Sequence, residues 1–413
     1  MNEQEFDRML EKYADVIVNI GLGLKKDQVL FISGILEDAP FVRAVAKSAY
    51  KAGAKYVDMA LVDEASARIA YEHANPEHIT YFPEYVFSRY EECFKNGDAF
   101  LSIASNNPDL LDGIDSDLIS KRRKSSMEKF FPIRTKYDNN YNWCIAATAT
   151  PLWAQKVFPG MPVEEAQAKL WDTIFNVCRV NQPDPVAAWT EHTNKLLSIK
   201  SYLNDKQYAF LHYKAPGTDL TIGLPDSHHW NAALETYKNG TTGTPNIPTE
   251  EVFTSPHKDK VEGHVSSTMP LNLSGRLVED FTITFEKGKA VKITAKKGED
   301  DLRKLMEMDE GASRLGEAAL VADSSPIKQS GILFYNTLFD ENAACHIALG
   351  DAFKDSFKGG HDLTDEEFQA AGGNKSIIHT DFMIGSAELD IDGITQSGEK
   401  EPVMRSGEWA FEA

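Results

Sequence analysis

Two patterns of apolar residues follow one another along the chain, and this change constrains the fold more than any other feature. In the first half, predicted strands at residues 28–33, 56–62, 99–104 and 142–147 alternate with helix-forming segments, and the first of them shows no polar alternation. Runs without polar alternation are typical of strands buried on both faces, as in a parallel sheet covered by helices. The first half therefore predicts an α/β domain built on a doubly wound parallel sheet.

After about residue 206 the strands alternate or pair as hairpins. Residues 277–285 and 290–295 flank the turn sequence Glu-Lys-Gly-Lys, which is typical of a β-hairpin. This half predicts an α+β domain rich in antiparallel strands, with short helices at residues 299–306 and 313–320. A predicted helix ends just before the change, so we expect an N-terminal α/β domain at residues 1–204 and a C-terminal α+β domain at residues 205–413.

The charge balance excludes several classes of partner. The chain has 63 acidic and 43 basic residues and a formal net charge of −20. Nucleic acids and anionic membranes both select basic surfaces, so neither is an expected partner. The first residues are polar and acidic, unlike a signal peptide, and no apolar run reaches the roughly 18 residues of a membrane span. The four cysteines lack paired spacing, so we expect a cytoplasmic protein without disulfides or a thiolate zinc site.

Residues 336–350 combine acidic, aromatic and imidazole side chains within otherwise apolar sequence. The pair Asp340-Glu341 follows Phe339, and His346 comes five residues after Glu341. Burying unpaired charged groups is costly, so these residues need a partner that stabilises them. Binding of a divalent metal ion is one such explanation.

Two further segments of the C-terminal half carry candidate ligands. His379 and Asp381 lie two apart in a predicted strand, so both side chains face the same side of it. Taken alone, they fit a buried His–Asp hydrogen bond equally well. Glu317 lies between a glycine and an Ala-Ala-Leu run; its alternative role is a carboxylate that interacts with a helix N-terminus.

A third segment places Glu250 and Glu251 before a β-prone run, where a helix cap or a surface pair is the alternative. Together, several carboxylates and two imidazoles suit Zn²⁺, Co²⁺, Mn²⁺ or Mg²⁺. The excess of carboxylates favours a two-metal site with a bridging carboxylate. His228 and His229 follow a turn signal, so we expect at least one to be exposed and either to line a cleft rather than to bind metal.

Several common motifs are absent from the sequence or incomplete. The Gly21-Leu22-Gly23 string lacks a third glycine and precedes a strand, so it predicts a helix end rather than a dinucleotide site. No P-loop, HExxH or GxSxG string occurs. The basic run at residues 121–124 lies in a predicted helix and is expected to be a solvated face.

The longer motifs resemble those of the thermophilic-type metallo-aminopeptidases, the group of aminopeptidase T, aminopeptidase S and peptidase S. The resemblance covers essentially the whole chain and is carried by residues 217–225, 246–254, 309–317, 334–344 and 379–381. It implies an exopeptidase that removes N-terminal residues from peptides with two divalent metal ions. It also implies a homodimer with an enclosed active-site chamber.

Transferred residue by residue, the resemblance implies six metal ligands, with Glu317 bridging both ions. We also expect a carboxylate to carry the proton to the leaving amine, and Glu317 is the first choice, although a bridging ligand is a weakened base. Glu250 is the alternative to Glu251, because the Pro-Thr-Glu-Glu string does not separate them. The implied ligands are Glu251, Glu317, Glu341, His346, His379 and Asp381.

The chain departs from the family at Phe353, where a tyrosine is usual and is thought to lie at the active site. If the hydroxyl stabilises the tetrahedral oxyanion, its loss lowers the rate by about 10²–10³, as for other oxyanion donors.

The main hypothesis from the sequence is a metal-dependent aminopeptidase. The alternatives are a catalytically impaired homologue that binds peptide or metal, and a dinuclear phosphoesterase, for which the sequence offers no phosphate cradle.

Overall fold

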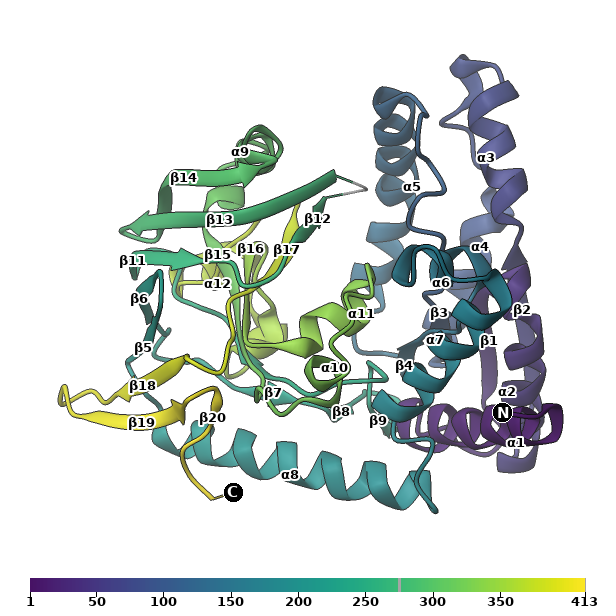
Figure 1. Cartoon of the computed structure of the whole chain (residues 1–413), viewed down its shortest axis with the longest axis horizontal. Helices are drawn as coiled ribbons and strands as arrows, with labels where there is room; N and C mark the ends of the chain where they lie inside the picture. The colour runs from purple at the N-terminus through teal and green to yellow at the C-terminus, as the bar shows by residue number, and fades with distance from the viewer. Residues whose placement is uncertain (274–275, 413) are drawn as a thin grey trace. The chain divides into compact units, whose positions relative to one another are not determined.

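The computed structural model describes residues 1–273 and 276–412, and the chain divides into two compact units. The first unit comprises Met1–Glu191 with Leu234–Pro248, and the second comprises His192–Ala233 with Thr249–Ala413. The predicted boundary at residue 204 lies near the end of α8 (Pro185–Lys206), whereas this division falls inside that helix and returns Leu234–Pro248 to the first unit. Figure 1 shows the elements of each unit along the chain.

The first unit contains the predicted parallel sheet, with strand order β2-β1-β3-β4. Central strand β1 pairs on both sides: Leu30 lies opposite Val57 in β2 and Ala99 in β3. All four runs form strands as predicted, to within two residues at each end. Their bounds are β1 (Val29–Ile35), β2 (Tyr56–Val62), β3 (Ala99–Ile103) and β4 (Trp143–Ala146).

The helices of the first unit follow the sequence signals closely. A capping box between Asn2 and Glu5 starts the first helix, and a π-helical turn (Ile17–Gly21) ends it, as the glycine string predicts. A side chain at Gly21 would place its Cβ 2.7 Å from Cys144 Sγ, which explains the glycine. The helices are α1 (Glu3–Val16), α2 (Ala39–Ala52), α3 (Glu64–His73), α4 (Glu84–Asn96), α5 (Ser116–Lys136), α6 (Pro151–Val157) and α7 (Val163–Val177).

The basic run lies on α5, and its residues behave differently from one another. Lys124 is exposed, as expected of a solvated face. Arg122 instead donates a hydrogen bond to the Ile79 carbonyl at 2.9 Å, and its guanidinium lies 4.6 Å from the Phe82 ring centroid. Arg122 therefore holds the segment before α4. Among the described residues, no helix has both the length and the apolar character that a membrane span requires.

The second unit contains two antiparallel sheets, as the hairpin pattern predicts. A five-stranded sheet has the order β17-β16-β15-β10-β7, and a larger sheet runs β12-β13-β11-β6-β5-β18-β19-β20 with β14 beside β13. The first comprises β7 (Asn231–Ala232), β10 (Val252–Thr254), β15 (Leu315–Leu320), β16 (His346–Gly350) and β17 (His379–Met383). The second comprises β5 (Phe210–Ala215), β6 (Thr218–Gly223), β11 (Val261–Ser266), β12 (Leu271–Leu273), β13 (Arg276–Glu286), β14 (Lys289–Lys297), β18 (Asp390–Ile394), β19 (Lys400–Arg405) and β20 (Glu408–Trp409).

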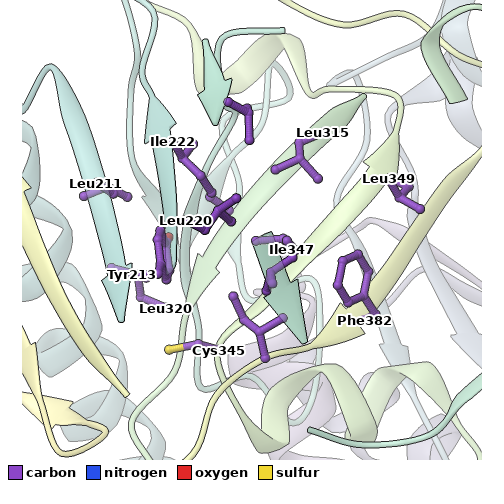
Figure 2. Close-up of a cluster of buried hydrophobic side chains, with 14 of the residues drawn as sticks. Leu211, Tyr213, Leu220, Ile222, Leu315, Leu320, Cys345, Ile347, Leu349 and Phe382 are labelled. Carbon is purple, nitrogen blue, oxygen red and sulfur yellow. The ribbon is translucent and has the colours of Figure 1, made fainter. Parts of the chain in front are cut away.

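One face of the five-stranded sheet packs into the hydrophobic core of the second unit. Ile347, Leu349 and Phe382 from this sheet join Leu211 and Leu220 from the larger sheet in one buried cluster (Figure 2). Because successive strand residues point to opposite faces, the residues between them face away from this core. We call that second face the ligand-bearing face.

The segment 313–320 differs from the prediction of a short helix. A 3₁₀ turn (Gly311–Ser313) is followed by strand β15, every residue of which is buried. Strand β15 pairs with β10 on one side and β16 on the other, and these ladders override the helix propensity of its alanines. The other predicted helix is confirmed as α9 (Glu299–Met306), and the unit also contains α10 (Pro326–Gln329), α11 (Thr337–Asp340) and α12 (Asp365–Ala370).

Candidate metal centre

The ligand-bearing face brings the candidate residues of four distant segments together. Glu317 lies on β15, and its neighbour across the ladder is Ala348 on β16, which in turn lies opposite Asp381 on β17. His346 occupies the start of β16, and Glu251 directly precedes β10. The strand register therefore places carboxylates and imidazoles on adjacent strands of one face.

Two groups of possible ligand atoms meet at Glu317. Potential ligand atoms of Glu251, Glu317 and His346 lie within 4.8 Å of one another, as do those of Glu317, His379 and Asp381. Within the described part of the chain, these are the groups with metal-binding geometry. A residue common to both triads is positioned as a bridging carboxylate would be.

Both imidazoles are oriented by backbone carbonyls. His346 Nδ1 donates to the Ala344 carbonyl at 3.1 Å, and its Nε2 lies 3.2 Å from a Glu251 oxygen. His379 Nδ1 donates to the Asp351 carbonyl at 2.8 Å, and its Nε2 lies 3.0 Å from a Glu317 oxygen. A hydrogen bond at Nδ1 fixes the tautomer and leaves Nε2 as the coordinating atom, an arrangement typical of metal-binding histidines.

The electrostatics of the cluster show why it suits cations. Burial, together with the charges of Asp381 and Glu251, raises the pKa of Glu317 to about 7 against the opposing effect of His379. Burial lowers the pKa of His346, but the hydrogen bond and charge of Glu251 outweigh it and raise that pKa to about 10. Buried carboxylates thus outnumber the imidazoles that balance them. Divalent cations bound by oxygen and nitrogen ligands would stabilise this arrangement.

The acidic pair at residues 340–341 divides between two roles. Glu341 begins a 3₁₀ turn (Glu341–Ala343) outside both triads, yet burial and the charges of Glu251 and Asp381 raise its pKa well above the ordinary range. The Glu341 carboxylate is therefore close enough to the candidate ligands to interact with their charges. Asp340 instead accepts hydrogen bonds from the backbone of Phe334 and Asn336 at 2.8 and 3.0 Å and holds its own loop.

The neighbouring glutamates at residues 250 and 251 point in different directions. Glu251 belongs to the first triad, whereas a Glu250 oxygen lies 3.6 Å from His192 Nε2. His192 was not among the candidates from sequence, although its side chain is only 10% exposed and lies beside Glu250. His192 lies three residues after Trp189 and four before Leu196 on α8. Residues with this spacing share one face of a helix, so the pattern could have placed His192 on the buried face.

Phe353 lies beside the cluster. Its ring centroid is 4.7 Å from that of His379 and 6.0 Å from that of Phe253, and its backbone N–H donates to Ser255 Oγ. The side chain is 37% exposed, which is unusual for phenylalanine and indicates an apolar wall next to the candidate ligands.

The histidine pair at residues 228–229 lies outside both triads, and the expectation that one of them is exposed is wrong. His228 is 2% exposed and donates from Nδ1 to the Pro225 carbonyl at 2.8 Å. His229 is partly buried, and its backbone N–H donates to the Ser356 carbonyl. Burial lowers the pKa of both imidazoles and thereby favours their neutral forms.

A β-bulge at Gly316 sets the position of Glu317. The register of β15 against β16 shifts between Leu315 and Glu317. A Cβ at residue 316 would lie 2.1 Å from the Asp351 carbonyl oxygen, so only glycine allows this approach. The bulge turns the following side chain towards the cluster.

Comparisons with known proteins point to one family. A sequence profile of the family described as thermophilic metalloprotease (M29) matches residues 6–409. Aminopeptidase 2 of Geobacillus stearothermophilus is 46% identical over 98% of this chain and 99% of its own, and aminopeptidase T of Thermus thermophilus is 41% identical over the same shares. The solved structure of wild-type AmpT from Thermus thermophilus superposes with a TM-score of 0.92, at 40% identity, over 98% of this chain and 100% of its own.

A profile match over nearly the whole length, full-length relatives above 40% identity and a matching fold lead to one conclusion: this chain belongs to the M29 family of thermophilic metalloproteases.

Proposed function

We propose that this protein is a metal-dependent aminopeptidase that hydrolyses the N-terminal residue from peptides at the ligand-bearing face. The observation that supports this most strongly is the pair of triads that share Glu317 on adjacent strands. Family membership and relatives named as aminopeptidases supply the reaction class.

The proposed centre holds two divalent cations, with Zn²⁺, Co²⁺, Mn²⁺ and Mg²⁺ as candidates. Glu251 and His346 would hold one ion, His379 and Asp381 the other, with Glu317 between them and Glu341 completing the set. Bound ions of this kind polarise the scissile carbonyl and lower the pKa of a coordinated water towards about 7.

The protein's own groups would orient the substrate and move the proton. Glu317 is shared by both triads and its Oε2 lies 3.0 Å from His379 Nε2, so we assign the role of proton shuttle to this carboxylate. The surrounding carboxylates would attract the positively charged α-amine of a peptide. Attraction of a free N-terminus favours exopeptidase over endopeptidase action.

The test compares free and blocked substrates on metal-reloaded protein. Unblocked aminoacyl-anilides are expected to be hydrolysed, and their N-acetylated counterparts to be untouched. Equal activity on both would remove the exopeptidase assignment, and hydrolysis of p-nitrophenyl phosphate in their place would favour the dinuclear phosphoesterase.

We also propose a cytoplasmic homodimer. The four cysteines are free thiols and buried, which suits a reducing compartment, and the family resemblance supports the dimer. Light scattering at a mass of twice 46.0 kDa checks the oligomeric state.

The alternative function is that of a catalytically impaired homologue. One observation favours it: a phenylalanine, Phe353, packs against His379. If a hydroxyl at this position stabilises the oxyanion, the Phe353→Tyr variant is expected to raise kcat by about 10²–10³ with little change in KM. Steady-state kinetics on one unblocked anilide measure it. An unchanged kcat would mean that this ring supplies only the apolar wall.

A further inference from the structure

The residue before Glu251 is held from two sides by side chains outside the ligand set. On one side, His192 Nε2 on α8 donates to the Thr249 carbonyl at 2.8 Å and lies 3.6 Å from a Glu250 oxygen. Thr249, Glu250 and Glu251 are all at most 9% exposed. The backbone that leads into Glu251 is therefore buried and bonded to a helix.

On the other side, Asn342 links this backbone to the segment of Glu341. Its Oδ1 accepts the Glu250 N–H at 2.7 Å, and its Nδ2 donates to the Leu338 carbonyl at 3.1 Å. The side chain is completely buried, and Ser325 Oγ donates to the Asn342 carbonyl at 2.7 Å. The oxygen and the nitrogen of this amide thus each have a partner, one in the segment of Glu251 and one in the segment of Glu341.

We propose that His192 and Asn342 are positioning residues that fix Glu251 relative to Glu341 and thereby set the affinity for divalent metal ions. The proposal rests on the proposed function in taking these two glutamates as ligands. Two carboxylates that are to share a metal site repel each other before an ion binds, so a fixed backbone is needed to keep them in place. Hydrogen bonds on both sides of Glu250 keep its neighbour from moving away.

The arrangement also explains why Glu250 and Glu251 diverge. The Glu250 backbone is bound to Asn342 and its side chain lies near His192, whereas a Glu251 oxygen lies 3.2 Å from His346 Nε2. The two partners of Glu250 thereby select which glutamate enters the cluster.

The experiment measures affinity for Zn²⁺ alone, by competition with a chromophoric chelator, in His192→Ala and Asn342→Ala. Each is expected to bind the ion about 10- to 100-fold more weakly, as for other residues that support metal ligands. His192→Gln, which keeps a donor near the Nε2 position, is expected to recover most of the affinity. Asn204→Ala is the matched control, because that side chain also makes two backbone hydrogen bonds, both to Trp230, away from the ligands.

The control is expected to lower Tm and to keep wild-type affinity. Wild-type affinity in both alanine variants, or an equal loss in Asn204→Ala, would overturn the proposal. If Asn342→Ala does not fold, the Zn²⁺ affinities of His192→Ala and His192→Gln test the proposal. A failure of the proposed function would appear differently, as metal-loaded wild-type protein that binds Zn²⁺ but hydrolyses no peptide.

Discussion

The Glu317→Gln variant is expected to lose hydrolytic activity by about 10²–10⁴-fold from the missing proton shuttle alone. Glutamine has nearly the same shape but cannot bridge two cations as a charged carboxylate does. Zn²⁺ affinity is therefore expected to fall together with kcat, whereas KM for any residual activity changes little.

The same variant is expected to be at least as stable as the wild type without metal. Burial raises the pKa of Glu317 to about 7, so its ionised form destabilises the metal-free fold, and glutamine removes that charge. Thermal unfolding in chelator measures this difference. Glu64→Gln, a change of another buried glutamate in the first unit, is the control and keeps full activity. An active Glu317→Gln variant with wild-type metal affinity would remove this residue from the centre.

Removal of metal ions has the second large expected effect. Dialysis against chelator is expected to reduce activity to background and to lower Tm, because the buried carboxylates then repel one another without a counter-charge. Each ion returned at about 100 times its Kd stabilises the fold by about 2.7 kcal/mol. The ion that restores most activity among Zn²⁺, Co²⁺, Mn²⁺ and Mg²⁺ identifies the catalytic metal.

The Glu317→Gln variant provides the control for this stabilisation. Its Tm is expected to respond weakly to added metal, whereas that of Glu64→Gln responds like the wild type. Undiminished activity and an unchanged Tm after chelation would contradict metal dependence.

The architecture of the first unit was predictable because local signals and tertiary structure agree there. Strand β1 is an apolar run that is buried on both faces, and α2 has a proline in its first turn and ends before Gly53, which is in the left-handed conformation. Propensity, hydrophobic pattern and capping indicate the same elements, so their bounds follow from sequence within a few residues.

The ligand-bearing face was only partly predictable, because its elements depend on partners far along the chain. The run Leu-Gly-Glu-Ala-Ala-Leu at residues 315–320 suits a helix as well as a strand, and only pairing with β10 and β16 decides between them. Glu317 was nevertheless a candidate, because an acidic residue among apolar ones needs a partner in either structure. Residue chemistry therefore predicted the candidate before its secondary structure was known.

Contacts between residues far apart in the sequence explain why the choice between Glu250 and Glu251 could not be predicted. The separation of Glu250 from Glu251 depends on Asn342, 92 residues away, and on His192 in α8. No local pattern around the Pro-Thr-Glu-Glu string contains this information. Asp340 is the opposite case, because its partner is only six residues away in the same loop. The sequence therefore predicts that this buried carboxylate needs a partner.

The most direct test of the dinuclear centre is a titration of stripped protein with Zn²⁺ or Co²⁺ in which bound metal and hydrolysis of an unblocked aminoacyl-anilide are measured together. A centre bridged by Glu317 predicts that activity reaches its plateau at two ions per chain. Full activity at one ion per chain, or before any ion binds, would contradict the account.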